Sequence, residues 1–328
     1  MPATAHSLHA RALHAALPAA VTALAAAAVV RRAGPESHPI PILLTGLTPW
    51  AFAPAYPLAL MALRRRRWWT FALAAGVAGA HAAWMAPELR RTVPAPESPS
   101  PGLSIRVALA NLWVSNPKRA ALGPALAGVH ADVLVLQELK PPFVEELRRA
   151  GLFDAYPYQY LCPRFDPQGI GVLSKMPLEA PAAVPLETAT AIGATIRVGA
   201  VPVEFWALHV HAPASNHGRL KWIEEFRALR EKVPATCGPS IVVGDFNATM
   251  QHPLMSDFAR RERFVEAHVA AGRPLASTWP ANRRWLPPVM RLDHVFVRDF
   301  EVCTAQEFAI PGSDHRGVVA DLVLRPRS

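Results

Sequence analysis

The chain has 328 residues, of which 51% are hydrophobic, and this is enough for one large domain with additional segments or for two domains. Its three cysteines, Cys162, Cys237 and Cys303, contain no C-x-x-C pair, so the sequence indicates neither a disulfide framework nor a zinc cluster. The net charge of +9 is unevenly divided: residues 1–101 contain 9 arginines and 3 glutamates, whereas residues 102–328 contain 25 basic and 22 acidic residues. This small excess argues against tight, charge-driven binding of duplex nucleic acid by the C-terminal part.

Three apolar stretches occupy the N-terminal third, at residues 13–30, 40–63 and 68–85. Each is about long enough to cross the roughly 30 Å hydrocarbon layer of a bilayer. We therefore expect residues 1–91 to form a membrane region with two or three transmembrane helices. Prolines at positions 41, 49, 54 and 57 would interrupt a helix in water, but a helix bundle in lipid tolerates them better.

An arginine cluster, Arg64–Arg67, separates the second and third stretches and is followed by Trp68 and Trp69. The positive-inside rule places this loop in the cytoplasm, and the third span then carries everything after Met85 to the outer face. These patterns predict a multi-pass protein of the cell membrane, in contact with the lipid bilayer through N-terminal helices, with an extracytoplasmic C-terminal domain. Two alternatives stay open: the first stretch is also typical of a signal peptide, and all three stretches could be buried helices of a soluble domain.

Residues 92–102, TVPAPESPSPG, are rich in proline and serine, a composition typical of an extended linker. We place the domain boundary there and expect residues 103–328 to form the second domain. Strand-like stretches in this part lie at residues 103–112, 131–139, 169–175, 193–198, 203–211, 240–247, 292–297 and 317–324. Helical patterns lie at residues 120–130, 142–150, 217–233 and 253–261. Many strands with fewer helices predict an α/β (α+β) four-layer sandwich, in which two packed sheets, mostly antiparallel or mixed, are flanked by helices.

Polar side chains follow several of these strands at the point where each strand ends. In IVVGDFNATM, residues 241–250, Asp245 and Asn247 come directly after a buried strand. Because side chains alternate along a strand, these two point to the same side. Other strand ends carry Asn111, Glu138, His209, His211, Asp293, His294, Asp314 and His315. Carboxylate, amide and imidazole groups at successive strand ends indicate one shared site.

Four motifs occur in a fixed order: LQE at 136–138, GDFN at 244–247, DHVFV at 293–297 and SDHRGVVADL at 313–322. In this combination the chain resembles the endonuclease/exonuclease/phosphatase superfamily, which includes DNase I-like nucleases, inositol-polyphosphate phosphatases and neutral sphingomyelinases. The resemblance covers about residues 103–325, and the whole chain looks like a membrane-anchored bacterial member. It implies metal-dependent hydrolysis of a phosphate ester without a covalent intermediate.

The resemblance also implies which residues bind the metal and the attacking water. Glu138, helped by Asn111, should bind Mg²⁺ or Mn²⁺, ions that prefer hard oxygen ligands. Asp245 should orient or deprotonate the water, and Asn247 should hold a phosphate oxygen. The metal neutralises developing charge, and donors that are already in place contribute much of the catalysis.

Histidines and further carboxylates complete the implied site. His315 and His209 should donate to the non-bridging oxygens of the transition state. Asp314 should fix the imidazole of His315, and Asp293 should support the leaving group or the network. His211 lies two residues beyond His209 and is an alternative to it, although the position within the motif favours His209.

The loop at residues 277–294, STWPANRRWLPPVMRLDH, is the most informative about the substrate. Its tryptophans, Trp279 and Trp285, lie close in sequence to Arg283, Arg284 and Arg291. Such a loop could stack bases and bind phosphates, or lie at a lipid interface, or pack with solvated arginines. Nucleic acid and phospholipid are therefore both possible phosphodiester substrates.

Three functions are compatible with these patterns. The first is a membrane-anchored, outward-facing, metal-dependent phosphodiesterase, either a nuclease or a lipid phosphodiesterase. The second is a phosphomonoesterase that acts on a small phosphorylated molecule. The third is a catalytically silent, membrane-bound scaffold that keeps the fold for binding. The complete acidic, amide and imidazole set favours an active enzyme, because a silent copy need not keep all of it.

Overall fold

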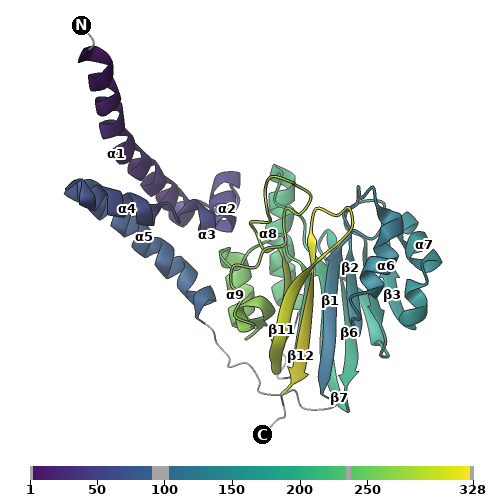
Figure 1. The fold of residues 1–328 in the computed structure, drawn as a ribbon. Coiled ribbons are helices and arrows are strands. Elements are labelled where there is room, and N and C mark those ends of the chain that lie inside the picture. Colours follow the sequence, from purple (N-terminus) through teal and green to yellow (C-terminus); the bar gives the residue numbers. More distant parts are fainter. Residues whose placement is uncertain (1–2, 91–102, 234–237, 326–328) are drawn as a thin grey trace. The chain divides into compact units, whose positions relative to one another are not determined.

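The structure is a computed structural model that describes residues 3–90, 103–233 and 238–325. The chain divides into two compact units, Met1–Pro87 and Glu88–Ser328 (Figure 1). The predicted linker, residues 92–102, lies outside the described residues. Each unit is described by itself.

The N-terminal unit is helical. Its helices are α1 (Ala3–Ala33), α2 (Pro39–Gly46), α3 (Thr48–Ala51), α4 (Ala55–Arg64) and α5 (Trp68–Leu89). His38 caps α2 by accepting a hydrogen bond from the Ile40 backbone N–H at 3.3 Å. Proline at the first or second position of α2 and α3 fits their first turns, because the backbone N–H that proline lacks has no intrahelical partner there.

The membrane spans differ from those expected from the sequence. Among the described residues, Ala15–Ala33 is the one helical segment long and apolar enough to cross a bilayer. The predicted second span, residues 40–63, is divided into three short helices, since proline interrupts a helix. The predicted third span lies within α5, in which tryptophans and His81 lower the mean hydropathy, and α5 is not among the described segments apolar enough to cross a bilayer. The multi-pass prediction is therefore not supported, and Ala15–Ala33 fits either a signal sequence or a single anchor.

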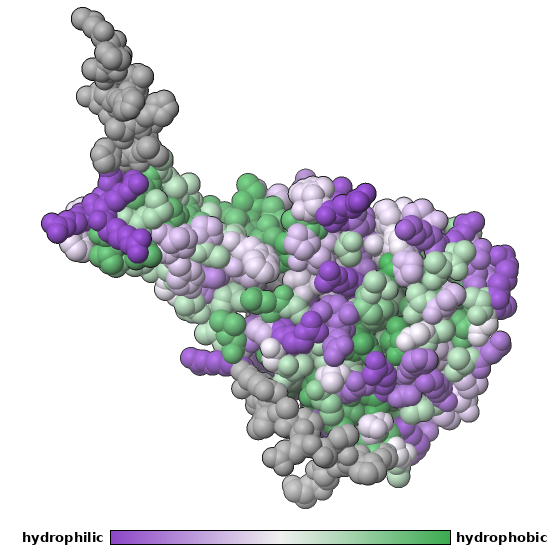
Figure 2. Space-filling model, in the orientation of Figure 1, coloured by the Kyte–Doolittle hydropathy of each residue, from purple (hydrophilic) through white to green (hydrophobic). Residues whose placement is uncertain are grey.

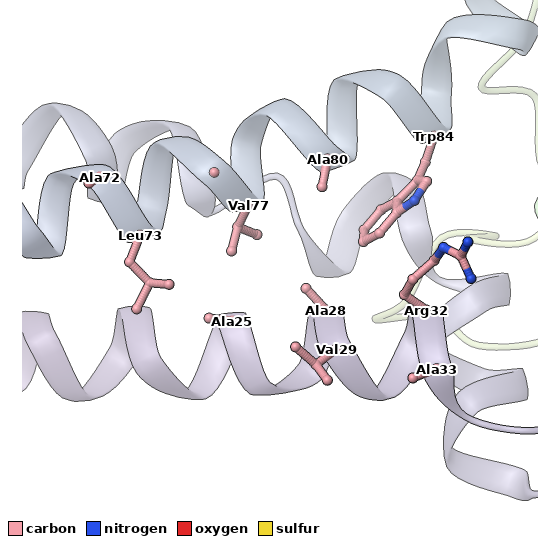
Figure 3. A pocket seen from close by; sticks show the side chains of 11 residues that line it. Ala25, Ala28, Val29, Arg32, Ala33, Ala72, Leu73, Val77, Ala80 and Trp84 are labelled. Carbon is pink, nitrogen blue, oxygen red and sulfur yellow. The ribbon is translucent and has the colours of Figure 1, made fainter.

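Exposed large apolar side chains are concentrated in the N-terminal unit, where Figure 2 shows hydrophobic patches next to strongly hydrophilic side chains. Trp69 and Trp68 are 90% and 62% exposed. Helices α1 and α5 also leave an open apolar groove of about 400 Å³ between them, with Ala28 facing Val77 and with Trp84 at one end (Figure 3). A surface of this kind is typical of contact with lipid or with another protein.

The C-terminal unit contains two mixed sheets of six strands each within the described residues. In order across the first sheet, the strands are β11 (Phe300–Ala309), β12 (Arg316–Leu324), β1 (Ser104–Asn111), β2 (Val133–Gln137), β4 (Ile170–Ser174) and β3 (Tyr158–Cys162). In order across the second sheet, they are β5 (Glu179–Leu186), β6 (Ala189–Val198), β7 (Val201–His209), β8 (Ser240–Asp245), β10 (Asp293–Arg298) and β9 (Val265–Glu266). In each sheet one adjacent pair is parallel, β1 with β2 and β7 with β8, and the other pairs are antiparallel.

Helices cover the outer face of each sheet (Figure 1). On the first sheet these are α6 (Leu122–Ala127) and α7 (Pro141–Arg149), with the short 3₁₀ turns η1 (Arg119–Ala121) and η2 (Leu152–Ala155). On the second sheet they are α8 (Asn216–Lys232) and α9 (Pro253–Arg261), whose aromatic side chains pack against Phe246 and Phe296. The short helix α10 (Ala267–Ala270) follows β9. The predicted sandwich of two mixed sheets with flanking helices is confirmed, and each predicted strand and helix of this unit has a counterpart.

The core between the two sheets is built from alternate residues of their strands. Leu109 and Val135 of the first sheet belong to the same buried cluster as Ala207, Val243 and Val295 of the second. The intervening side chains face the helices, as Leu134 and Leu136 of β2 do. This period of two decides which residue at the end of each strand faces the space between the sheets.

Close packing between β7 and β8 makes a glycine necessary at position 244. A Cβ at Gly244 would overlap the carbonyl oxygen of Leu208. That oxygen belongs to the backbone of β7, which cannot withdraw without disturbing the parallel pairing. We expect Gly244→Ala to lower the free energy of unfolding by about 1–3 kcal/mol.

Chemical denaturation followed by tryptophan fluorescence measures this effect. Gly128→Ala is the matched control, because the nearest atom to a Cβ at Gly128 is the Ala125 carbonyl oxygen at an ordinary 3.5 Å. Equal stability of the two variants would contradict the argument.

Candidate active site

Polar residues replace the apolar core at one end of the sandwich. On each contributing strand the polar residue lies two positions from an apolar core residue and therefore points inward as that residue does. These polar residues are Asn111, Gln137, His209, Asp245 and Asp293, and the corresponding core residues are Leu109, Val135, Ala207, Val243 and Val295. Strand pairing brings them together, since Asp245 is in register with both His209 and Asp293, and Asn111 with Gln137. All of these side chains are buried. The alternation that builds the core therefore also builds the site.

One oxygen of Asp245 is the centre of this group. The Asn111 side-chain amide donates to Asp245 Oδ2 at 2.9 Å. The Nε2 atoms of His209 and His315 lie 3.6 Å and 3.8 Å from the same oxygen. Burial and, to a smaller extent, the charge of Asp293 raise the pKa of Asp245, the two histidines oppose the shift, and the resulting pKa is about 6. Asp245 is therefore a stronger base than an exposed aspartate and is still mostly ionised at neutral pH.

His315 is held by Asp293. Their Nδ1 and Oδ2 atoms are 2.8 Å apart, and both side chains are buried. Burial by itself lowers the pKa of His315, but the carboxylates of Asp293 and Asp245 outweigh it and raise the pKa to about 10. A protonated imidazole donates from both ring nitrogens, so His315 can bond Asp293 with one and a substrate oxygen with the other.

The sequence-based expectation that Asp314 fixes His315 differs from this arrangement. The adjacent Asp314 side chain instead accepts a hydrogen bond from the Trp279 indole at 3.3 Å. Its Oδ1 atom is buried and has no hydrogen-bond partner among the described residues. Burial raises the pKa of Asp314, and the negative charge of Glu138 adds to this effect, so the two carboxylates lie within electrostatic reach of each other.

Glu138 follows β2 and has a left-handed backbone conformation, with φ of 54°. The Asn111 amide donates to its Oε1 atom at 3.2 Å, and the Val114 backbone N–H donates to its Oε2 atom. Asn111 thus connects Glu138 to Asp245, while its own amide oxygen accepts from the Trp113 N–H at 3.0 Å. The structure places the two residues expected to bind metal in direct contact, with the Asn111 nitrogen facing Glu138.

Two groups of residues could hold a metal ion. The ligand atoms of Asp245, Asp293 and His315 all lie within 4.8 Å of one another. In that group, however, the imidazole already balances one carboxylate charge and its Nδ1 is bonded to Asp293. Glu138 and Asp314 form no ion pair within the described residues, and Asp314 has an unpartnered buried oxygen. Carboxylate oxygens without a cationic partner suit a hard divalent cation.

Asn247 lies beside the group, two residues after Asp245. Its backbone N–H donates to Asp245 Oδ1 at 2.8 Å, and its side-chain amide donates to the Val210 carbonyl at 2.8 Å. Its φ of 48° falls in the left-handed region, which asparagine tolerates better than most residues. Asn247 thus fixes the turn that ends β8 and joins it to the end of β7.

His209, the last residue of β7, and His211 have different partners. His209 is buried and faces Asp245. His211 bonds Glu225 of α8 instead, so the structure places His209, and not His211, in the group around Asp245. His294, which follows Asp293 in the DH motif, lies apart from this group: it is buried and bonds Ala248, Arg291 and Glu266, so its position is structural.

Sequence reasoning missed some residues that support the site. The Ser313 hydroxyl donates to the Asn111 carbonyl at 2.7 Å and accepts from the His315 N–H at 3.0 Å, so it ties β1 to the final motif. The serine of SDH was the available signal. Gln137 is buried with neither side-chain polar atom partnered among the described residues, and the pattern LQE alone did not indicate this.

The loop at residues 277–294 is anchored at the site. Two of its residues donate hydrogen bonds to Asp314: the Trp279 indole to the side chain, and the Ala281 backbone N–H to the backbone carbonyl at 2.7 Å. Farther along, Arg283 and Arg284 are exposed and Trp285 is 78% exposed. The loop thus has one tryptophan that supports the site and one that faces solvent.

A sandwich of two mixed sheets with acidic and imidazole groups gathered at one end is a phosphoesterase architecture. The sequence profile of the Endonuclease/Exonuclease/phosphatase family matches residues 108–315, more than half of the chain. The chain therefore belongs to this family and is a hydrolase.

Solved structures share the fold at low sequence identity. An endonuclease/exonuclease/phosphatase from Beutenbergia cavernae is 20% identical, with 68% of this chain and 72% of that chain covered and a TM-score of 0.53. A family protein from Bacteroides thetaiotaomicron is 16% identical, with 70% and 100% covered and a TM-score of 0.53. D. rerio TDP2 complexed with a single-strand DNA product is 16% identical, with 67% and 98% covered and a TM-score of 0.53. No functionally curated protein matches the chain.

The pair of Asp293 and His315 gives a direct test of the site. Asp293→Asn keeps the shape of the side chain but removes the charge that holds His315 protonated. We expect kcat/KM for a phosphate ester to fall by about 10²-fold or more, with little change in melting temperature. Steady-state kinetics and thermal unfolding measure the two quantities.

Asp321→Asn is the control for loss of an aspartate in the same unit. Asp321 lies on β12, where it pairs with Arg106 and is partly exposed. If Asp293→Asn were as active as this control, the interaction with His315 would have no role in turnover.

Proposed function

We propose that this protein hydrolyses phosphodiesters with Mg²⁺ or Mn²⁺, without a covalent intermediate. The observation that carries the proposal is the convergence of Asn111, His209 and His315 on Asp245 Oδ2, at 2.9, 3.6 and 3.8 Å. A carboxylate base lies next to imidazole donors in a buried setting, where hydrogen bonds to developing charge are strongest.

Glu138 and Asp314 are the proposed metal ligands, with Asn111 positioning Glu138. Within the described residues Glu138 and Asp314 have no ion-pair partner, whereas Asp245 and Asp293 share the imidazole of His315. The charge of Glu138 contributes to the raised pKa of Asp314, so the two carboxylates lie near each other, and these two observations support this choice over the Asp245, Asp293 and His315 group. A divalent cation bound there supplies neutralisation of charge on the phosphate oxygens.

The remaining residues act on water and phosphate. Asp245, with a pKa of about 6, accepts the proton of the attacking water, which adds to phosphorus as the bond to the leaving oxygen breaks. His315, kept protonated by Asp293, donates to a non-bridging phosphate oxygen. His209 is placed to donate to a second oxygen, and Asn247, fixed by Val210, to orient the phosphate. Each group is already in position, so little reorganisation accompanies the reaction.

Nucleic acid is the first substrate to examine. D. rerio TDP2, a protein of the same fold, has been crystallised with a single-strand DNA product. In this chain the exposed Arg283, Arg284 and Trp285 lie on a loop anchored at Asp314, and could bind phosphate and stack on a base. A phospholipid is the second phosphodiester to examine, because the N-terminal unit has an apolar surface.

Membrane attachment through Ala15–Ala33 is part of the proposal. The outward-facing prediction depended on two spans around Arg64–Arg67, and one span removes that basis. Fusion of alkaline phosphatase or a fluorescent protein at the C-terminus would determine the side. Phosphatase activity of the fusion supports the extracytoplasmic placement, and fluorescence alone contradicts it.

The metal assignment gives a specific prediction. Glu138→Gln and Asp314→Asn should each raise the Mg²⁺ concentration needed for half-maximal activity by at least about tenfold, because each removes one charged ligand. Asp245→Ala should lower kcat by about 10²–10⁴-fold, since it removes the base. Turnover of plasmid DNA, single-stranded DNA, sphingomyelin and phosphatidylinositol is measured with Mg²⁺, with Mn²⁺ and with EDTA.

The control for these variants is Glu145→Gln, an exposed residue of α7 that pairs with Arg148. Activity that persists in EDTA would overturn the metal requirement. Full activity of Asp245→Ala would overturn the site. Cleavage of phosphomonoesters alone would replace the proposal with a phosphomonoesterase, and binding without cleavage would replace it with a scaffold.

A further inference from the structure

His211 is a second histidine held by a buried carboxylate, outside the group around Asp245. It follows β7 in the loop that leads to α8. The residue before it, Val210, is bonded to the site from both sides: its N–H donates to the Asp245 carbonyl at 3.0 Å, and its own carbonyl accepts from the Asn247 amide at 2.8 Å. His211 therefore lies one residue from backbone that is fixed to two site residues.

Glu225 of α8 holds this histidine. Its side chain is fully buried. Glu225 Oε1 is 2.5 Å from His211 Nδ1 and accepts from the Thr188 hydroxyl at 2.7 Å, and Oε2 accepts from the His211 backbone N–H at 2.8 Å. An ionised carboxylate can only accept hydrogen bonds, so Nδ1 has the proton in this contact.

This contact determines which edge of the ring faces outward. The two nitrogens lie on opposite edges of an imidazole, so with Nδ1 directed at buried Glu225, Nε2 is directed away from it. The His211 side chain is 20% exposed, whereas Glu225 is not exposed at all. The exposed part of the imidazole therefore lies on the side away from Glu225, which is the side to which Nε2 is directed. A purely structural contact to Glu225 needs Nδ1 alone and leaves Nε2 without a role.

The surroundings of His211 place it at the rim of the site. Asp166, in the loop between β3 and β4, has a lowered pKa, mainly through its hydrogen bond with Arg164, and the charge of His211 also contributes. That loop is joined to the residue after Glu138, because Arg164 N–H donates to the Leu139 carbonyl at 3.0 Å. His211 thus lies between the Asn247 turn and the loop beside Glu138.

We propose that His211, as an imidazolium whose Nδ1–H is bonded to Glu225, donates from Nε2 to a second anionic group of the substrate, adjacent to the phosphate that is cleaved. The inference rests on the proposed function and narrows its substrate class to phosphodiesters that bear another phosphate or similar anion nearby. Glu225 acts through His211 and is a positioning residue.

The test uses the full chain and a variant that separates binding from structure. In His211→Asn the side-chain amide can take the place of Nδ1 and keep the bond to Glu225, but nothing replaces Nε2. The probes are thymidine 5′-(4-nitrophenyl phosphate) and the same compound with a 3′-phosphate, both of which release 4-nitrophenol. We expect the ratio of kcat/KM for the second probe to that for the first to fall about tenfold, mainly through KM, with the melting temperature preserved.

His130→Asn is the matched control. His130 is exposed, lies before β2 at the opposite end of the strand from Glu138, and has a φ of 54° that asparagine accepts. The ratio should stay at the wild-type value in this variant. An unchanged ratio in His211→Asn overturns the inference, whether or not its stability changes. Loss of turnover in Asp245→Ala tests the proposed function separately, since it affects both probes.

A second measurement does not need turnover. In protein labelled with ¹⁵N at histidine, the Nε2 resonance of His211 is identified as the one absent from His211→Asn. Thymidine 3′,5′-bisphosphate should shift it at lower concentration than thymidine 5′-monophosphate does. Equal response to the two nucleotides, or no response, contradicts binding of a second anion even if the protein cleaves neither probe.

Discussion

The alternation of side chains along the paired strands is the constraint on which the rest of the C-terminal unit depends. It fills the space between the two sheets with valine, isoleucine and leucine, and at one end it places Asn111, His209, Asp245 and Asp293 in the same inward row. A shift of one residue in the register of β8 would move Asp245 to the helix-covered face and Phe246 into the site. The stability of the core and the geometry of the site are thus consequences of a single register.

Burying a carboxylate costs free energy unless hydrogen bonds or an opposite charge stabilise it. The two groups of carboxylates in this site are stabilised in different ways. Asp245 and Asp293 share the protonated imidazole of His315, so this group is close to balanced by itself. Glu138 and Asp314 receive hydrogen bonds only from neutral donors, the Asn111 amide, the Val114 backbone N–H and the Trp279 indole. The charge of His315 also lowers the pKa of Asp314, but Glu138 and Asp314 have no ion-pair partner within the described residues, and burying two such carboxylates together is costly without a cation. This comparison supports the proposal that the second group holds the metal and the first moves the proton.

Much of this arrangement could be predicted from sequence, because strand ends and short motifs are local signals. Asp245 and Asn247 of GDFN and Asp314 and His315 of SDH lie at the same end of the sandwich, and the strands next to them have the predicted extents to within a few residues. Which carboxylate holds His315 could not be predicted. Asp314 is adjacent in sequence, but neighbouring side chains at a strand entrance diverge, and Asp293 reaches the imidazole through the pairing of β10 with β8. The pairing of β10 with β8 joins segments that are far apart in the sequence, so no short motif indicates it.

In the N-terminal unit the sequence predicted more membrane-spanning structure than the fold contains. Apolar length predicted two or three spans, yet prolines divide residues 40–63 into three short helices. Composition reports how much apolar surface a segment has, whereas a span also requires an unbroken helix of sufficient length. Large apolar side chains such as Trp68 and Trp69 are exposed in this unit, and exposed apolar surface of this kind is suited to contact with lipid or protein.

The histidines at the end of β7, His209 and His211, have similar positions in the sequence but different surroundings in the fold. At strand spacing His209 and His211 would share a face, and sequence could only choose between them. The strand ends at His209, and the chain then turns toward α8, so the second imidazole meets Glu225 instead of Asp245. Each histidine has its own carboxylate environment, and each presents Nε2 in a different direction. The sequence offered the two histidines as alternatives for one position, whereas in the fold they occupy different positions, and we propose that His209 contacts the reacting phosphate and His211 the part of the substrate beside it.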